Sequence, residues 1–227
     1  MKASSSSPRM FDSDVVDYFS RTHAAVVPIL FVPAIIGMLV VGAGREHVGG
    51  ATGAALFLGG FGFWTLVEYW LHRLLFHWKP RARWGDRLHF LIHGVHHAWP
   101  RDKYRLVMPP AVSLSLFFVF LGLFVALLGR TLAWSFHAGF VAGYVNYDLT
   151  HYWLHHGRPL TERGRLLKKH HMQHHFKDDT SHFGVSFMLW DRVFGTLALR
   201  AAPPPRASPP GAHAAGADPG PTLGGAH

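Results

Sequence analysis

Histidine is unusually frequent in this sequence and falls into groups with recurring spacings. The chain has 19 histidines in 227 residues and no cysteine. The stretch KKHHMQHHF, residues 168–176, places four histidines within six positions. Neutral imidazole is the commonest metal ligand in proteins, and the lack of cysteine excludes thiolate ligands, disulfides and cysteine nucleophiles. Metal binding is therefore the first chemistry to consider for this chain.

Ten of the histidines form four groups whose spacings place imidazoles on common helix faces. On an α-helix, positions i, i+3 and i+4 point within about 100° of one another, so an HxxHH triplet forms a fan on one face. The outer two members of a fan diverge enough to serve two neighbouring metals. A pair five residues apart needs a bend or a helix end between its members. The groups are His72 and His77; His93, His96 and His97; His151 and His155; and His171, His174 and His175.

The number and type of these ligands narrow the chemistry. Ten nitrogens suit two metal ions with about five ligands each and one position open on each ion, whereas two structural zinc ions need only about eight. Imidazole ligands favour iron, zinc, copper or nickel over magnesium or calcium. An open, paired site suits redox chemistry with dioxygen, and we find no hydrolytic nucleophile in the sequence. Spacing alone leaves His170 as an alternative to His171, because His170 and His174 are also four apart.

Several residues beside the four groups are candidates for a supporting role. A side chain next to a ligand can orient it by bonding to its other ring nitrogen. Glu68 precedes His72 by four residues, although it could instead pair with Arg73 or Lys79, and Asp148 precedes His151 by three, although it could instead cap a helix end. The full set of candidates is Glu68, His89, Asp148, His156, His170 and His182. The isolated histidines are not expected to bind metal: His23, His47, His137, His213 and His227.

Four apolar stretches are the elements that would position the histidines. They cover residues 24–44, 50–67, 110–129 and 131–147, and each approaches the roughly 20 residues that a membrane-spanning helix needs. Only 15% of the residues are charged, against roughly 25% in ordinary soluble proteins. The connections within each pair are short. The sequence therefore predicts an all-α integral membrane protein with four transmembrane helices in two hairpins.

Lys and Arg residues indicate which side of the membrane each connection faces. All 22 except Arg45 and Arg130 lie before the first stretch, between the second and third, or after the fourth. Cytoplasmic segments carry the excess of basic residues, so we expect both termini and the middle segment to be cytoplasmic. All four histidine groups lie on that side, which predicts a cytoplasmic helical cap holding a dimetal site. The membrane would be the inner membrane of a bacterium or the endoplasmic reticulum of a eukaryote.

Composition also divides the chain. Residues 1–21 form a short cytoplasmic segment, residues 22–200 the membrane domain, and residues 201–227 a tail rich in Pro, Ala and Gly that we expect to be disordered. The formal net charge of +9 could attract nucleic acid or anionic lipid. With four apolar stretches in the chain, membrane lipids are the expected partner and nucleic acid is not.

The arrangement resembles the membrane fatty acid hydroxylase/sterol desaturase superfamily. The segments HGVHHAWPRDKYRLVMPP, YDLTHYWLHHG, KKHHMQHHF and FGVSFMLWDRVFGT are similar to fatty acid 2-hydroxylases, and DKYRLVMPP is the most specific of them. The resemblance implies that the ten ligands are those given above, with His171 rather than His170. It also implies iron in the active enzyme, with zinc possible after purification, dioxygen as co-substrate, and a fatty acyl lipid as substrate. The dimetal centre itself would be the catalytic group, with no separate acid or base.

One feature departs from many eukaryotic relatives, which carry a fused cytochrome b5 domain ahead of the membrane part. Here the first apolar stretch begins at residue 24, and no heme-binding HPGG precedes it. We therefore expect a separate electron donor, cytochrome b5-like or ferredoxin-like. Basic residues could dock an acidic donor or bind anionic lipid heads: Arg73, Lys79, Arg81, Arg83 and Arg87. The alternatives are a sterol or carotenoid hydroxylase or desaturase of the same superfamily, and a histidine-rich metal transporter.

Overall fold

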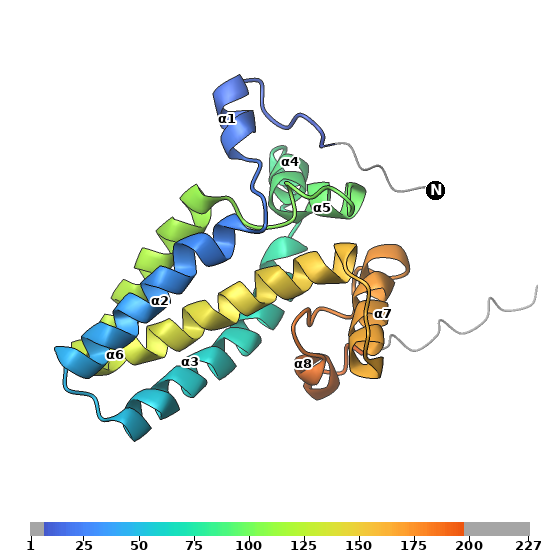
Figure 1. The fold of residues 1–227 in the computed structure, drawn as a ribbon. Coiled ribbons are helices and arrows are strands. Elements are labelled where there is room, and N and C mark those ends of the chain that lie inside the picture. Colours follow the sequence, from blue (N-terminus) through green and yellow to red (C-terminus); the bar gives the residue numbers. More distant parts are fainter. Residues whose placement is uncertain (1–6, 198–227) are drawn as a thin grey trace, which may run out of the picture. The chain divides into compact units, whose positions relative to one another are not determined.

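The computed structural model describes residues 7–197, and every regular element in this range is a helix. Figure 1 shows them in chain order. The long helices are α2 (Val26–Gly44), α3 (Gly50–Trp70) and α6 (Pro110–His156). The shorter elements are α1 (Asp14–Phe19), η1 (Leu71–Phe76), α4 (Gly85–His89), η2 (Phe90–Gly94), α5 (Val95–Ala98), α7 (Glu162–Phe176) and α8 (Leu189–Val193). The predicted all-helical class is confirmed, while the predicted tail, residues 201–227, lies outside the described residues.

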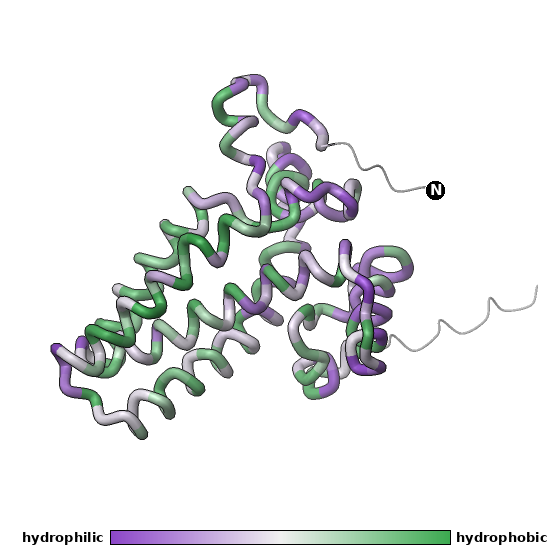
Figure 2. The backbone as a smooth tube through the Cα atoms, in the orientation of Figure 1, coloured by the Kyte–Doolittle hydropathy of each residue, from purple (hydrophilic) through white to green (hydrophobic). Residues whose placement is uncertain are grey.

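The three long helices are long and apolar enough to cross a membrane. Most of the residues coloured as hydrophobic in Figure 2 lie in these three helices, whereas the hydrophilic residues gather in α7 and around α4 and α5. Many of their large apolar side chains are exposed, among them Ile29, Ile36 and Val40 of α2. In water such exposure would be costly, but in lipid it is the expected state of an outward-facing side chain.

Helix α6 contains both of the last two predicted stretches. Its backbone leaves the helical conformation at Gly129, where φ is +76°, a value that glycine adopts readily because it has no Cβ. Side chains on either side of this residue pack against each other: the Phe120 and Phe140 rings are 4.8 Å apart, and those of Phe124 and Phe136 are 5.0 Å apart. The chain therefore reverses direction at Gly129, and α6 consists of two antiparallel arms.

Small residues bring α3 and α6 into close contact. A Cβ on Gly60 would lie 1.9 Å from the carbonyl oxygen of Phe136, and one on Gly139 would lie 1.8 Å from that of Phe57. Glycine at these positions lets the two backbones approach closely, as in helix pairs packed within membranes. The second arm of α6, which ends at His156, is thereby fixed against α3. Helix η1, which carries His72, continues α3, so both histidine-bearing elements are positioned by this packing.

Candidate metal centre

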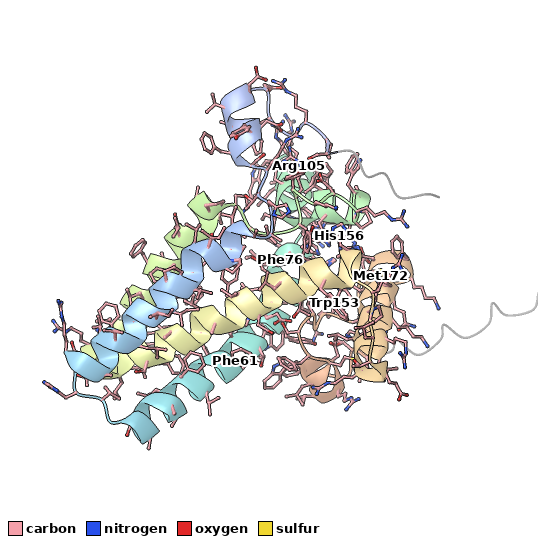
Figure 3. The ribbon with its side chains drawn as sticks, viewed as in Figure 1. Phe61, Phe76, Arg105, Trp153, His156 and Met172 are labelled. Carbon is pink, nitrogen blue, oxygen red and sulfur yellow. The ribbon has the colours of Figure 1, made fainter. Side chains whose placement is uncertain are left out.

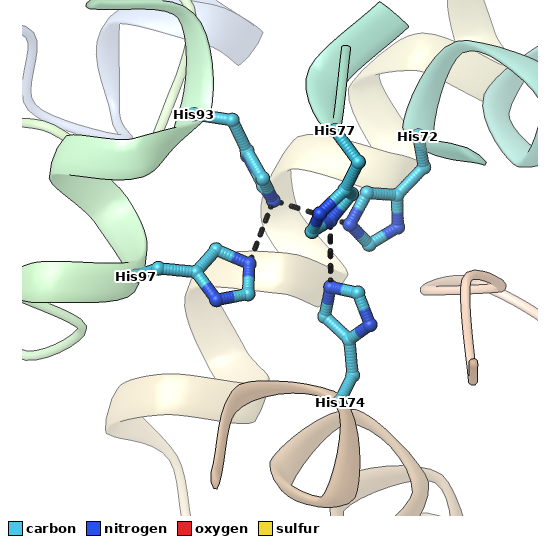
Figure 4. Close-up of side chains that lie close together, drawn as sticks. All are labelled: His72, His77, His93, His97 and His174. Atoms are coloured by element: carbon cyan, nitrogen blue, oxygen red, sulfur yellow. Dashed lines mark hydrogen bonds between the residues drawn. The ribbon is translucent and has the colours of Figure 1, made fainter. Parts of the chain in front are cut away.

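The ten histidines come from separate parts of the chain and lie together in two groups of five. Their nearest ring nitrogens lie within 4.8 Å of one another in each group. The first group, shown in Figure 4, is His72, His77, His93, His97 and His174. The second group is His96, His151, His155, His171 and His175. These are the ten residues that the spacings and the resemblance single out.

The distances within each group fit a shared metal ion. In the first group, the Nε2 atoms of His72 and His97 lie 3.2 and 3.0 Å from Nε2 of His93. In the second, Nε2 of His155 lies 2.8 Å from that of His171. With metal–nitrogen bonds of about 2.0–2.1 Å, ligands at right angles are about 2.9 Å apart and opposite ligands about 4.2 Å apart. Each group therefore has the donor set and the size of a metal site.

The two fans divide between the groups in the same way. His93 and His97, four apart, share the first group, while His96 belongs to the second. In α7 the i and i+4 residues, His171 and His175, share the second group, while His174 belongs to the first. The i+3 position diverges from the i+4 position by about 100°. Each fan therefore contributes histidines to both groups.

His72 and His77, which are five residues apart, are brought to the same side of the chain by a π-helix rather than by a simple bend. His72 lies in η1, which continues α3 without interruption, and His77 caps its end. In a π-helix the hydrogen bonds run from residue i to i+5, so residues five apart lie over one another. The rings of His72 and His77 are 5.2 Å apart. The local change of helix type thus delivers both imidazoles to one group.

The two groups adjoin each other, and most of their members are buried. The rings of His97, from the first group, and His175, from the second, stack 4.2 Å apart. Burial lowers the pKa of His93, His96 and His171 well below the ordinary imidazole value, and the repulsion that protonated neighbouring histidines would exert lowers it further. The imidazoles are therefore neutral at pH 7, which leaves a lone pair on each ring for a metal.

Glu68 is buried beside the first group but does not bond to His72. Its Oε1 accepts hydrogen bonds from the backbone N–H groups of Val185 and Ser186. Nδ1 of His72 instead donates to the backbone carbonyl of Phe183 at 2.5 Å. Glu68 thus contacts the same loop that orients His72, and its relation to that ligand is indirect.

The other candidate supporting residues have varied surroundings. His170 bonds to the carboxylate of Asp191 at 3.1 Å, and its ring stacks on that of His182. Asp148 is buried, but it bonds to neither nitrogen of His151. His89 and His156 lie at the margin, and Nε2 of each has no hydrogen-bond partner among residues 7–197.

Two backbone carbonyls and one aspartate contribute to the site, and the histidine spacings indicate none of them. The backbone carbonyl of Ser181 accepts a hydrogen bond from Nδ1 of His174 at 2.7 Å, as that of Phe183 does from His72. Asp191 anchors the same loop by accepting from the N–H groups of Phe183 and Gly184. The segment FGVSFMLWDRVFGT contains this aspartate, but no spacing relates it to the histidines.

A cavity of about 340 Å³ reaches the histidines from one side. Three histidines form part of its wall: His93, His96 and His151. Asp148 and Tyr147 also line the cavity, as does Arg105, which Figure 3 labels close to the N-terminal segment. Most of the remaining lining is apolar: Phe76, Leu91, Ile92, Val95, Leu106, Val107, Met108, Pro109 and Val112. The cavity can therefore bring an apolar molecule to histidines of both groups.

Comparison with known proteins places the chain in a family. The fatty acid hydroxylase family model matches residues 57–196. A dihydroceramide fatty acyl 2-hydroxylase of Arabidopsis thaliana is 38% identical over 190 residues, which cover 84% of this chain and 80% of the relative. The chain belongs to the fatty acid hydroxylase family, and the resemblance inferred from its motifs is confirmed.

Further relatives agree with this assignment. The ceramide very long chain fatty acid hydroxylase of Saccharomyces cerevisiae is 42% identical over 81% of this chain and 48% of its own length. The fatty acid 2-hydroxylase of Rattus norvegicus is 39% identical over 86% of this chain and 58% of its own length. A solved structure of full-length scs7p, in which only the hydroxylase domain is visible, superposes with a TM-score of 0.76 at 40% identity, covering 81% of this chain and 69% of that one.

Proposed function

We propose that this protein hydroxylates the 2-carbon of a fatty acyl chain, free or within a ceramide or other sphingolipid. The observation that carries the proposal is the 340 Å³ cavity, whose mostly apolar wall includes His93, His96 and His151. An acyl chain matches such a lining because apolar surface gains free energy on leaving water. The named activities of the Arabidopsis, yeast and rat relatives support the same reaction.

The ten histidines would hold two iron ions, one in each group. Iron bound there would supply the redox chemistry that activates dioxygen, with two electrons from a separate donor. The chain's own contribution is to keep the imidazoles neutral and oriented and to bring the substrate beside them. Tyr147 and Asp148 form the polar part of the cavity wall next to His151. They are placed to contact the polar end of an acyl substrate, which would set the 2-carbon close to the histidines.

The membrane arrangement we propose has four transmembrane segments: α2, α3 and the two arms of α6. The reversal at Gly129 and the basic residues at the histidine end support this arrangement, with both termini and the site on the cytoplasmic side. An acyl chain could then reach the cavity from the bilayer while its head group stays among basic residues.

The electron donor would dock on exposed basic residues at the histidine end. Lys79, Arg81, Arg83 and Arg87 are exposed, whereas Arg73 is half-buried and donates a hydrogen bond to the hydroxyl of Tyr69. The first four residues therefore form the better surface for an acidic donor. The same charges would also attract anionic lipid heads, so replacing them should weaken reduction by the donor if docking is their role.

The deciding experiment is product identification. The iron-loaded protein, supplied with a reductant system, a ceramide or free fatty acid and ¹⁸O-labelled dioxygen, should yield a 2-hydroxy acyl product that carries one labelled oxygen by mass spectrometry. The His96→Ala variant serves as the control for background oxidation. A hydroxyl group at another carbon, or a product only from sterols or carotenoids, would contradict the proposal, and so would metal transport without any oxidised lipid.

A further inference from the structure

One loop orients two ligands of the first histidine group through its backbone. The carbonyl of Ser181 accepts a hydrogen bond from Nδ1 of His174 at 2.7 Å, and the carbonyl of Phe183 accepts one from Nδ1 of His72 at 2.5 Å. A histidine whose Nδ1 carries the donated proton presents the lone pair of Nε2 to a metal. The loop 181–186 therefore fixes both the ring orientation and the tautomer of His72 and His174, which come from different elements.

Two buried carboxylates hold this loop in place. The N–H groups of Phe183 and Gly184 donate to Asp191 at 2.8 and 2.7 Å. Those of the next two residues, Val185 and Ser186, both donate to Oε1 of Glu68, at 2.9 and 2.7 Å. Four consecutive backbone amides thus donate to the side-chain oxygens of two buried acidic residues, which fixes the path of the loop through four hydrogen bonds.

The loop itself is tightly constrained. A Cβ on Gly184 would lie 2.6 Å from Oδ2 of Asp191 and 2.2 Å from the carbonyl oxygen of Phe187. His182 adopts a positive φ of 62°, which is uncommon for a residue other than glycine and persists only where the surroundings enforce it. Its N–H donates to the carbonyl of Thr196 at 2.9 Å. The loop therefore has little freedom to move its carbonyls away from the histidines.

The second histidine group lacks a comparable arrangement. Within the described part of the chain, Nδ1 of His171 and Nδ1 of His175 have no hydrogen-bond partner, and neither nitrogen of His151 has one. The orientation of these rings depends on packing against their neighbours. Partners that orient a ligand typically change metal affinity by about 10–100-fold, so the two groups should differ in how firmly they hold a metal.

We propose that Glu68 and Asp191 are positioning residues that act through the loop 181–186 on His72 and His174, so that the first histidine group binds its metal more tightly than the second. The inference rests on the proposed function only in taking both groups as metal sites. It adds an order of metal affinity and assigns a role to two carboxylates that are not ligands.

The test isolates each site in the full-length protein. The double substitution His151→Ala/His155→Ala removes two of the five ligands of the second group and leaves one metal at the first, whereas His72→Ala/His77→Ala does the same to the first group and leaves one metal at the second. Zinc, which needs about four ligands, is the probe, and its affinity is measured by competition with a chelator of known affinity. In the His151→Ala/His155→Ala background, Glu68→Leu should weaken zinc binding about 10–100-fold. In the His72→Ala/His77→Ala background the same substitution should leave zinc affinity unchanged.

Conservative and control variants separate positioning from general damage. Glu68→Gln keeps an oxygen that can accept both loop amides, so it should restore affinity at the first site. Asp191→Asn should weaken zinc binding at the first site as Glu68→Leu does, because its amide nitrogen would face a backbone N–H donor of the loop. If the Glu68→Leu protein does not fold, Asp191→Asn provides the test instead. Asp102→Asn is the matched control, since Asp102 is equally buried but bonds to the N–H of Tyr104 instead.

The wild-type protein provides a second measurement. With increasing chelator, zinc should leave in two steps, the second-group metal first. Simultaneous loss of both metals, or an equal effect of Glu68→Leu in the two backgrounds, would overturn the inference. Product formation by the iron-loaded enzyme is measured separately, so 2-hydroxylation could be established while the difference between the sites is refuted.

Discussion

His96 and His97 are adjacent in the sequence, yet their imidazoles belong to different histidine groups. Nε2 of His96 lies 3.0 Å from Nε2 of His175, whereas Nε2 of His97 lies 3.0 Å from Nε2 of His93. Adjacent residues on a helix point about 100° apart. The two imidazoles therefore point to opposite sides of the boundary between the two histidine groups. Neighbouring substitutions should therefore have separable effects on the two metals.

We expect His96→Ala and His97→Ala each to weaken metal binding at one of the two sites, and the double variant to weaken it at both. Loss of a partner that only orients a ligand costs about 10–100-fold in activity, so loss of a ligand should cost at least about 100-fold. Metal per protein and product formation are measured at matched expression. His47→Asn is the control, because His47 lies in the connection between α2 and α3 and asparagine tolerates its positive φ. Full metal content together with full product formation in His96→Ala would refute the assignment of this ligand.

The metal that is loaded should decide activity. Imidazole sites bind zinc more tightly than ferrous iron in the usual order of divalent metals. Protein purified without added iron should therefore contain zinc and be inactive, because zinc does not change its oxidation state. Removal of zinc by a chelator and reloading with ferrous iron under anaerobic conditions should restore product formation. Equal rates for the zinc and iron forms would show that the oxygenase mechanism is wrong.

The positions of the histidine fans could be predicted because helix period fixes side-chain direction locally. Three residues that lie within five positions of one α-helix, such as His171, His174 and His175 of α7, carry their geometry in their spacing. The hairpin at Gly129 could be expected too, since a short connection containing Arg130 separates the two apolar stretches 110–129 and 131–147. In each case the information needed is confined to a short segment of the chain.

The rest of the site depends on contacts that sequence does not display. The convergence of His72 and His77 requires a π-helix, and spacing alone indicates only that some irregularity is needed. The groups that orient His72 and His174 are backbone carbonyls, which every residue has. Glu68 meets Val185 across 117 positions of sequence, so its role is visible only when the fold brings α3 and the loop together.

The N-terminal segment should be held to the histidine end by a buried ion pair. Asp17 of α1 bonds to Arg105 at 2.8 Å, and the Arg105 side chain is only 2% exposed. Removing one partner of such a pair costs about 3–5 kcal/mol, because the other charge is left buried. Asp17→Asn should thus destabilise the docked segment and abolish hydrogen-exchange protection of the Met10 amide, which donates to Asp17. Asp14 lies on the same helix as Asp17 and forms an exposed pair with Arg9, so Asp14→Asn should cost at most about 1 kcal/mol.

The same contact should show little dependence on pH in the physiological range. The backbone N–H of Met10, and then Arg21 and Arg105, hold the pKa of Asp17 well below its usual value. A lowered pKa means that the carboxylate stabilises the folded state fully above the ordinary carboxyl pKa of about 4, and that this stabilisation is lost only as the pH falls below it. The protection factor of the Met10 amide should therefore be constant from about pH 8 to pH 5. A decline within that window would contradict the assignment.

Acyl chain length should respond to Met108, because this side chain lines two neighbouring spaces. One is the 340 Å³ cavity beside the histidines, and the other is a smaller apolar space of about 40 Å³ between α2, α3 and α6, bounded by Phe117, His137 and Phe140. A flexible methionine at the junction separates the two in this structure.

Met108→Ala should join them and shift the 2-hydroxy products towards longer chains, whereas Met108→Trp should close the junction and favour shorter ones. Because about one methylene in an apolar pocket is worth roughly 10-fold or more in discrimination, the ratio of long to short products should change about 10-fold in opposite directions. Met188→Ala is the matched control, since Met188 lines a different space between α7 and α8. An unchanged product profile in both Met108 variants, with activity retained, would show that the acyl tail does not pass this residue.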